Sequence, residues 1–196
     1  MTVAVGVILA SVREKRRGAA YARWIHGLLT ERPGVEARLL DLPDYPLGPH
    51  AHEQMPRALE TAYADDAARR GSETIHAHDG HILVRPEYNH GYPGQLKNAI
   101  DQVFTGWFCK PVAFASYGGN AGGARAVEQL RNVAVEVRMV PVHGEVNIRL
   151  IGLQTDESGA PTDPMYARYA TGMLAQRRWW TRATKQARAA EAPPAM

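Results

Sequence analysis

Residues 80–101, GHILVRPEYNHGYPGQLKNAID, carry the signals of a strand, a turn and a helix in immediate succession. Residues 81–84 are mostly apolar, and Pro86 has no N–H group with which to continue a hydrogen-bond ladder. Beyond the turn, Leu96 and Ile100 recur at helical spacing. The stretch therefore predicts a strand over residues 80–84, a loop over 86–94 and a helix over 94–104.

The same alternation continues on both sides of this stretch. Residues 3–10, VAVGVILA, form an apolar run typical of a strand that is buried on both faces. Further strands are predicted over 35–42, 111–117 and 139–142, and helices over 19–30, 57–70, 124–135 and 164–187. Alternating strands and helices predict an α/β fold with a doubly wound, five-stranded parallel sheet. We expect residues 1–188 to form a single domain and residues 189–196, rich in Ala and Pro, to form a disordered tail.

Composition limits the classes of partner. The chain has 196 residues, a formal charge of +3 and a single cysteine, Cys109, so that no intrachain disulfide can form. Its scattered basic residues favour an anionic small molecule over nucleic acid. No apolar stretch reaches the roughly 18 residues of a membrane span, and the N-terminal apolar run precedes its positive charges, unlike a secretory signal. We therefore expect a cytoplasmic protein that binds neither nucleic acid nor membrane.

Three loops leave the predicted carboxyl ends of strands, where open α/β sheets bind their ligands. Residues 11–18 combine a serine with arginines at a helix start, which suits either a phosphate or a solvated helix entry. The backbone amides of residues 87–89 could face a flat heteroaromatic ring, or this segment could be a plain Pro/Gly turn. Residues 116–123 contain four glycines, which permit close approach of backbone to a ligand but also occur in ordinary helix-entry turns.

Together these motifs resemble the NAD(P)H-dependent FMN reductases of the flavodoxin-like fold. Members of that family carry a Ser-x-Arg loop, a Pro-Glu-Tyr-Asn segment followed by Pro-Gly-x-Leu-Lys-Asn-Ala-Ile-Asp, and a Gly-rich loop. This chain has Ser11-Val12-Arg13, Pro86–Asn89, Pro93–Asp101 and Ser116–Gly119 in the same order, and the resemblance covers residues 3–142.

The resemblance implies FMN and NAD(P)H as cofactors, in a homodimer or homotetramer. Hydride would pass to flavin N5 and then to a quinone, an azo compound, a similar small acceptor or free flavin, without a catalytic side chain. The same motifs would also suit an FMN-binding regulatory or electron-carrier module without NAD(P)H turnover. The implied contacts are Ser11, Arg13, Arg16, Arg17 and Gly18 on the phosphate, Pro86, Glu87, Tyr88 and Asn89 on the isoalloxazine, and Ser116, Tyr117, Gly118 and Gly119 on its pyrimidine side.

Three places depart from the family pattern. Ala10 replaces a common Gly, Arg16 and Gly18 replace Ser and Asn, and Arg85 stands where a small residue such as Thr is usual. A cation at position 85 could raise the reduction potential of the flavin, bind an acidic acceptor or turn outward, and we expect the outward orientation.

Two further groups of residues have a functional and a structural interpretation. His76, His78, Asp79 and His81 precede a strand on the side away from the expected cofactor, so we expect a solvated connection and no metal. The last helix carries large apolar residues near helical spacing, which we expect to pack in the core. These residues are Met165, Tyr169, Met173 and Trp180. Tyr92 and Trp107 are candidates to cover the flavin.

Overall fold

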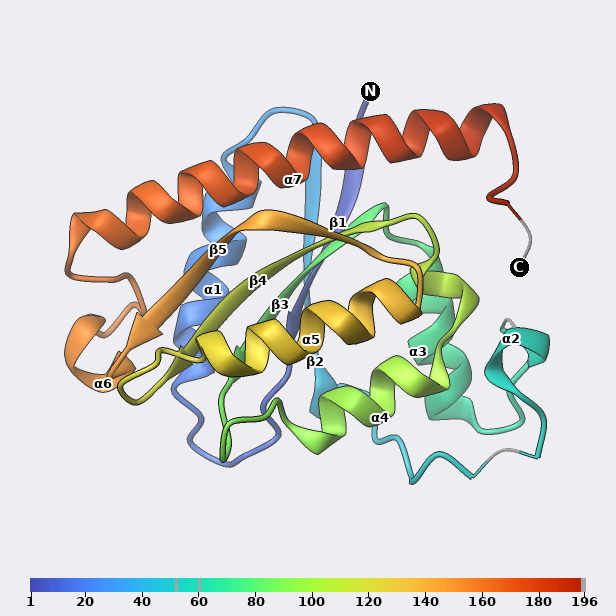
Figure 1. Ribbon diagram of the computed structural model, residues 1–196, viewed down its shortest axis with the longest axis horizontal. Helices are drawn as coiled ribbons and strands as arrows, with labels where there is room; N and C mark the ends of the chain where they lie inside the picture. Colours follow the sequence, from blue (N-terminus) through green and yellow to red (C-terminus); the bar gives the residue numbers. More distant parts are fainter. Residues whose placement is uncertain (52, 60, 195–196) are drawn as a thin grey trace.

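The computed structural model describes residues 1–194 with the exception of 52 and 60. Five parallel strands form one sheet in the order β2-β1-β3-β4-β5 (Figure 1). This order confirms the predicted doubly wound sheet and is that of flavodoxin-like folds. The strands are β1 (Val3–Leu9), β2 (Val35–Asp41), β3 (Gly80–Pro86), β4 (Pro111–Gly118) and β5 (Val140–Arg149).

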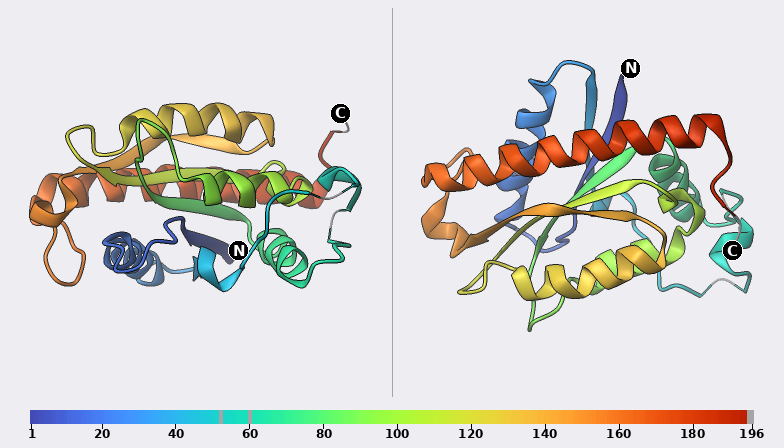
Figure 2. Two further views of the ribbon diagram at one scale, coloured as in Figure 1. Left: turned by 90° about the horizontal axis from the view of Figure 1, so that it is seen from below. Right: turned by 45° about the horizontal axis from the view of Figure 1, so that its top comes forward.

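Helices cover both faces of the sheet, which explains why its central strands are mostly apolar on both faces. One face is covered by α1 (Gly18–Thr30) and α7 (Pro164–Ala190), and the other by α3 (Asp66–His76), α4 (Gly94–Gln102) and α5 (Ala124–Glu136). In Figure 2, α1 and α5 lie on opposite sides of the sheet. The connections contain α2 (Pro56–Leu59), α6 (Ile151–Gln154) and two 3-10 turns at Leu42–Asp44 and Thr105–Trp107.

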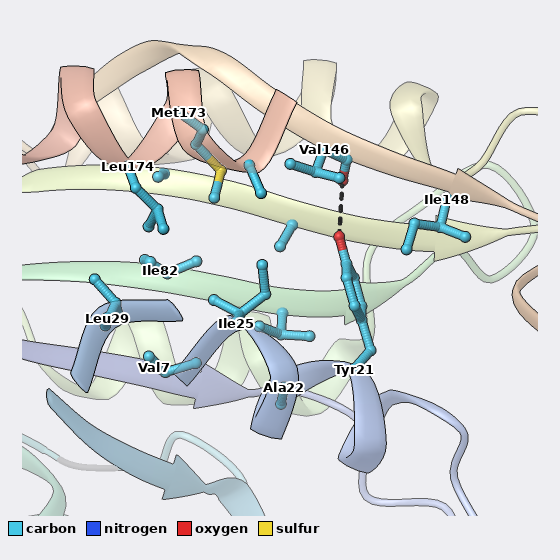
Figure 3. Packing of buried hydrophobic residues seen from close by; sticks show 14 of the residues in the cluster. Val7, Tyr21, Ala22, Ile25, Leu29, Ile82, Val146, Ile148, Met173 and Leu174 are labelled. Atoms are coloured by element: carbon cyan, nitrogen blue, oxygen red, sulfur yellow. Dashed lines mark hydrogen bonds between the residues drawn. The ribbon is translucent and has the colours of Figure 1, made fainter. Parts of the chain in front are cut away.

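The buried face of α1 holds the amino end of this helix in place beside the sheet. Tyr21, Ile25 and Leu29 recur every four residues and are fully buried. The Tyr21 hydroxyl donates a hydrogen bond to the carbonyl oxygen of Val146 in β5 at 3.4 Å (Figure 3). Burial, with a smaller contribution from Tyr166, raises the pKa of Tyr21 well above its ordinary value. The side chains that pack around this face include Val7, Ile82, Met173 and Leu174.

The helix predicted over residues 57–70 is wrong. The structure has the short helix α2 and then α3, which begins only at Asp66 and continues to His76. Asp65 caps α3, because its carboxylate accepts a hydrogen bond from the N–H of Ala68 at 2.8 Å. Tyr63 is buried and its hydroxyl donates to the carbonyl oxygen of Gln102. A capping residue and a tertiary anchor thus outweigh the weak helical periodicity.

The fifth strand is longer than predicted, and so is the last helix. β5 continues from Val140 to Arg149, with a shift of register opposite Val112 and Phe114. The irregularity interrupts the alternation of apolar residues that would have revealed the strand. Helix α7 includes the first two residues of the expected tail, residues 191–194 lie outside helices and strands, and residues 195–196 lie outside the described part.

The histidine-rich connection before β3 is solvated only in part: His76 is exposed as expected, whereas His78 and His81 are buried. His81 is fully buried, His78 is 7% exposed, and the His81 ring meets the Trp107 ring edge-on at 5.0 Å. Trp107 is therefore core at the amino end of β3 and is wrongly predicted to cover the flavin. Among the described residues no group of three or more His, Cys, Asp or Glu is placed to hold a metal ion.

Candidate functional site

The three loops meet at the carboxyl edge of the sheet. The N–H of Ala10 donates to Val84 at 2.9 Å, and the N–H of Glu87 donates to the carbonyl oxygen of Tyr117 at 3.1 Å. These bonds extend the pairing of β1, β3 and β4 beyond the strands. The loops therefore leave the sheet side by side, and their side chains come within contact distance of one another.

The first loop brings Ser11 against the second loop. Ser11 is 1% exposed, and its hydroxyl lies 3.0 Å from the hydroxyl of Tyr88. The neighbouring arginines point elsewhere: Arg13 is exposed, and the Arg16 guanidinium pairs with Asp41 at the end of β2. Burial raises the pKa of Asp41, and the charge of Arg16 opposes that shift. One of the predicted phosphate ligands is therefore paired with a carboxylate of β2.

Gly18 begins α1 and lies directly under a tyrosine of the third loop. A Cβ at position 18 would lie only 2.2 Å from the Tyr117 hydroxyl oxygen, so only glycine fits here. Burial raises the pKa of Tyr117 to about 12, so the phenol remains neutral. Helix α1 has no side-chain cap and no acidic residue in its first turn. An uncapped helix start of this kind fits an anion such as the FMN phosphate.

The second loop is a tight two-residue turn. Tyr88 and Gly91 exchange both backbone hydrogen bonds at 2.9 Å, while Asn89 and His90 have φ angles of 49° and 70°. Positive φ at both central positions is the type I′ pattern, which asparagine tolerates better than histidine. The backbone amides of Glu87 and Tyr88 are thus engaged within the protein. Of the two interpretations of this segment, the turn is the one that holds for the amides of these two residues.

Two side chains of helix α5 bind this turn from its outer side. Arg125 donates to a carboxylate oxygen of Glu87 and contacts Nε2 of His90 at 2.7 Å, and Gln129 donates to the His90 carbonyl oxygen at 2.9 Å. Burial raises the pKa of Glu87, but the hydrogen bond and the charge of Arg125 lower it. Together with smaller contributions they outweigh burial, so the net shift of the pKa is downward. These contacts hold the strained turn in one conformation. Neither Arg125 nor Gln129 was assigned to the site from the sequence, although a cation such as Arg125 in the first turn of a helix is itself unusual.

The third loop depends on two glycines in left-handed conformation. Gly122 and Gly123 have φ angles of 61° and 93°, and a Cβ on Gly123 would lie 2.7 Å from the side chain of Ser116. The Ser116 hydroxyl lies 2.8 Å from the Gly122 carbonyl oxygen and also contacts Asn147 of β5. Around Gly119 the space is open, with no atom within 4 Å of an added Cβ. The loop therefore offers exposed backbone on a rigid base.

Arg85 does not turn outward, so this expectation is wrong. Its side chain is fully buried at the end of β3, beside the turn that precedes α5. Among the predicted contact residues, Ser11, Gly18, Tyr88 and Tyr117 come together, whereas Arg13 and Arg17 stay exposed at the rim. Asp41, Arg125, Gln129 and Asn147 join the site from elements that sequence reasoning did not connect with it.

The sequence family described as NADPH-dependent FMN reductase matches residues 3–151. The chain belongs to this family. An NAD(P)H-dependent FMN reductase of Schizosaccharomyces pombe is 34% identical over 143 residues, which are 72% of this chain and 71% of that protein. A quinone reductase of Escherichia coli is 32% identical over 141 residues, which are 67% of this chain and 69% of that protein.

A solved structure supports the same assignment of the reductase fold. The flavoenzyme NAD(P)H:(acceptor) oxidoreductase FerB from Paracoccus denitrificans matches with a TM-score of 0.75 and 27% identity, over 93% of this chain and 99% of that one. These findings confirm the resemblance, the flavodoxin-like fold, the oxidoreductase class, and FMN with NAD(P)H as cofactors. No helix of the reductase, within the residues described, is long and apolar enough to cross a membrane.

Proposed function

We propose that this reductase oxidises NAD(P)H through an FMN held by its three loops, and then reduces a quinone-like, azo or similar small acceptor, or free flavin. The observation that carries the assignment of the site is the meeting of Ser11, Gly18, Tyr88 and Tyr117 above the uncapped start of α1. Bound FMN would supply the hydride-accepting chemistry, so the protein needs to bind and orient rather than to act as an acid or base.

In this proposal each loop has a separate task. Ser11, Arg13, Arg17 and the N–H groups at the start of α1 hold the phosphate, with Arg16 close by in its pair with Asp41. Pro86 to Asn89 lie against the isoalloxazine. Asn89 lies in the turn that α5 holds through the carbonyl oxygen of His90. The open backbone around Gly119, together with the neighbouring Gly118, Ser116 and Tyr117, receives the pyrimidine side.

A hollow beside the first loop suits the small acceptor. It has a volume of about 230 Å³ and lies between that loop, the end of β2 and the start of α4. Apolar walls with two amide side chains favour a flat, weakly polar molecule over a charged one. Its lining includes Val12, Leu42, Tyr45, Gln95 and Asn98.

The experiment separates cofactor binding from turnover. Purified protein is reconstituted with FMN, freed of excess flavin and mixed anaerobically with NADPH or NADH while flavin absorbance is recorded. Bleaching, followed by recovery of colour on addition of a quinone, supports the proposal. Bound FMN that neither nucleotide bleaches would instead favour the electron-carrier or regulatory module, and protein that takes up no FMN contradicts the site.

A pair of variants tests the phosphate assignment itself. Arg13→Glu places a carboxylate at the rim of the first loop, whereas Arg182→Glu makes the same charge change on an exposed position of α7. We expect the first variant to weaken FMN binding and the second to leave it unchanged. Equal FMN affinity for both variants would remove Arg13 from the site.

We also propose a cytoplasmic homodimer. Tyr169, Trp179 and Trp180 are 52%, 64% and 39% exposed on α7, so the predicted core packing of this helix is wrong for Tyr169 and Trp180. Exposed aromatics along α7 favour burial against a second copy, and dependence on NAD(P)H is typical of a cytoplasmic enzyme. Analytical ultracentrifugation of Trp179→Glu should show dissociation, and an unchanged sedimentation coefficient would exclude this surface.

A further inference from the structure

Arg85 is a fully buried cation directly behind two of the cofactor loops. It is the residue before Pro86 in β3 and pairs in register with Ser116 of β4. Side chains alternate along a strand, so Arg85 points to the same face as Leu83, which packs in the cluster of α4 and α5. It therefore occupies the layer between the sheet and α5, at the level where the second and third loops leave the strands.

The guanidinium of Arg85 joins these two loops. Its Nη1 donates to the carbonyl oxygen of Pro86 at 3.2 Å, and its Nη2 donates to the carbonyl oxygen of Gly123 at 3.1 Å. Pro86 is the last residue of β3 and leads into the second loop, and Gly123 closes the third loop just before α5. A rigid, planar fork with one arm on each loop fixes the separation between them, which a flexible ammonium would hold less strictly.

The charge of Arg85 is only partly balanced. Its Nε and the Oε2 atom of Glu87 are both buried without a hydrogen-bond partner in the described structure, while the other Glu87 oxygen is taken by Arg125. Burial lowers the pKa of Arg85 to about 10, and the carboxylates of Glu87 and Glu145 oppose that shift. The guanidinium thus remains protonated at neutral pH and places a positive charge behind the loops.

Stability does not explain such a residue, because a buried charge without a close partner is usually no better for folding than an apolar side chain of similar volume. We propose that Arg85 is a positioning residue for FMN, which sets the spacing of the second and third loops and, through its charge, favours the reduced, more negative flavin over the oxidised one. This inference rests on the proposed function for the location of the site.

The test uses the affinity for oxidised FMN and the midpoint potential of the bound flavin. Arg85→Met removes both the fork and the charge, whereas Arg85→Lys retains the charge alone. Arg177→Met is the matched control, since Arg177 is an equally buried arginine on α7 with a pKa likewise lowered to about 10 by burial. Potentials are measured by anaerobic dithionite titration against a reference dye, which requires no reaction with NAD(P)H.

We expect Arg85→Met to bind oxidised FMN about tenfold more weakly, since it loses two hydrogen bonds from a charged donor. We expect it to bind reduced FMN a further tenfold more weakly, which lowers a two-electron midpoint potential by about 30 mV. Arg85→Lys should show the weaker affinity with a potential close to that of the wild type. The Arg177→Met control should match the wild type in both quantities.

Unchanged affinity and potential in Arg85→Met would overturn the inference, and a lowered affinity with unchanged potential would overturn its electrostatic half. If Arg85→Met does not fold, as judged by its thermal unfolding, Arg85→Lys tests the spacing through affinity alone, and wild-type affinity there would overturn it. Failure of NADPH to bleach wild-type FMN would refute the proposed function but would leave these outcomes intact.

Discussion

Replacement of Arg177 tests whether a buried, unpaired charge weakens the fold. Arg177 lies on the inner face of α7 and is fully buried. Its Nη1 donates to Thr181 at 3.2 Å, but its Nε and Nη2 have no partner in the described structure. Burial lowers the pKa of Arg177 to about 10, and the nearby cations Arg32 and Arg178 lower it further. The guanidinium therefore destabilises the native state relative to the unfolded chain.

The size of this effect follows from the pKa. Lowering the pKa of Arg177 from 12.5 to about 10 corresponds to a cost of about 3 kcal/mol to the folded protein. The Arg177→Met variant removes the charge and keeps a long, flexible side chain that can fill the same space. We expect the free energy of unfolding to rise by about 1–3 kcal/mol, the range seen when buried charges give way to apolar residues. Arg177 stays protonated in both states from pH 6 to pH 9, so the gain should not vary with pH in that range.

The assay is urea unfolding of FMN-free protein, because bound cofactor would add its own stabilisation. The control is Arg182→Met, one turn further along α7 and exposed, which should change the free energy of unfolding by less than about 0.5 kcal/mol. A slope of the unfolding free energy against urea equal to that of the wild type is required for the comparison. Arg177→Met protein less stable than the wild type by about 1 kcal/mol would refute the reasoning and show that the guanidinium is satisfied.

Three further predictions concern glycine and titratable groups. Gly159 has a φ of 85° and a Cβ there would lie 2.2 Å from the carbonyl carbon of Ala20, so Gly159→Ala should lower the free energy of unfolding in urea by about 2 kcal/mol or more. Its control is Gly27→Ala, in open space on α1, which should raise the free energy of unfolding by up to about 1 kcal/mol. Equal stability of the two variants would contradict the contact. Burial and then the charge of Lys110 lower the pKa of His81 well below its ordinary value, so the folded state excludes the proton that the unfolded chain binds. Stability should fall as the pH drops below about 6.5, and His81→Phe, followed by thermal unfolding, should flatten that fall. Burial likewise lowers the pKa of Lys110 to about 7, so stability should rise from pH 7 towards the unfolded value of about 10.4; a Lys110→Met variant that kept the rise would show that other groups cause it.

The strands and the order of the loops could be predicted because their signals are local. Residues 3–9 are apolar throughout and residues 111–115 likewise, since helices cover both faces of the sheet, and the prediction from their composition was correct. β5 was predicted too short, because the shift of register near Val112 breaks the alternation of its side chains. The helix over 57–70 failed for a different reason, since Asp65 and Tyr63 set the start of α3 through contacts that periodicity does not carry.

The residues of the site also divide into those that the sequence revealed and those that it did not. Motifs that are continuous in the chain, such as Pro86–Asn89 and Ser116–Gly119, could be assigned to the cofactor from their resemblance to a family. The partners of these motifs could not, because the contacts join residues far apart in the chain. Arg125 and Gln129 of α5 bind Glu87 and His90, which lie 38 and 39 residues earlier, and Asn147 of β5 binds Ser116, which lies 31 residues earlier. Their contacts exist only once α5 and β5 have packed beside β3 and β4.

The sequence by itself determined the class of this protein: an α/β sheet with helices on both faces, three loops at its carboxyl edge, and membership of a flavin-dependent reductase family. These features follow from apolar runs, turn residues and contiguous motifs, which depend on neighbours within a few positions. Only the tertiary structure decided that Arg85 is buried behind the loops, that Tyr117 covers Gly18 and that α5 clamps the turn at Asn89. The physical reason is that the environment of a charge or hydroxyl is set by whatever packs against it, which the residue type does not reveal.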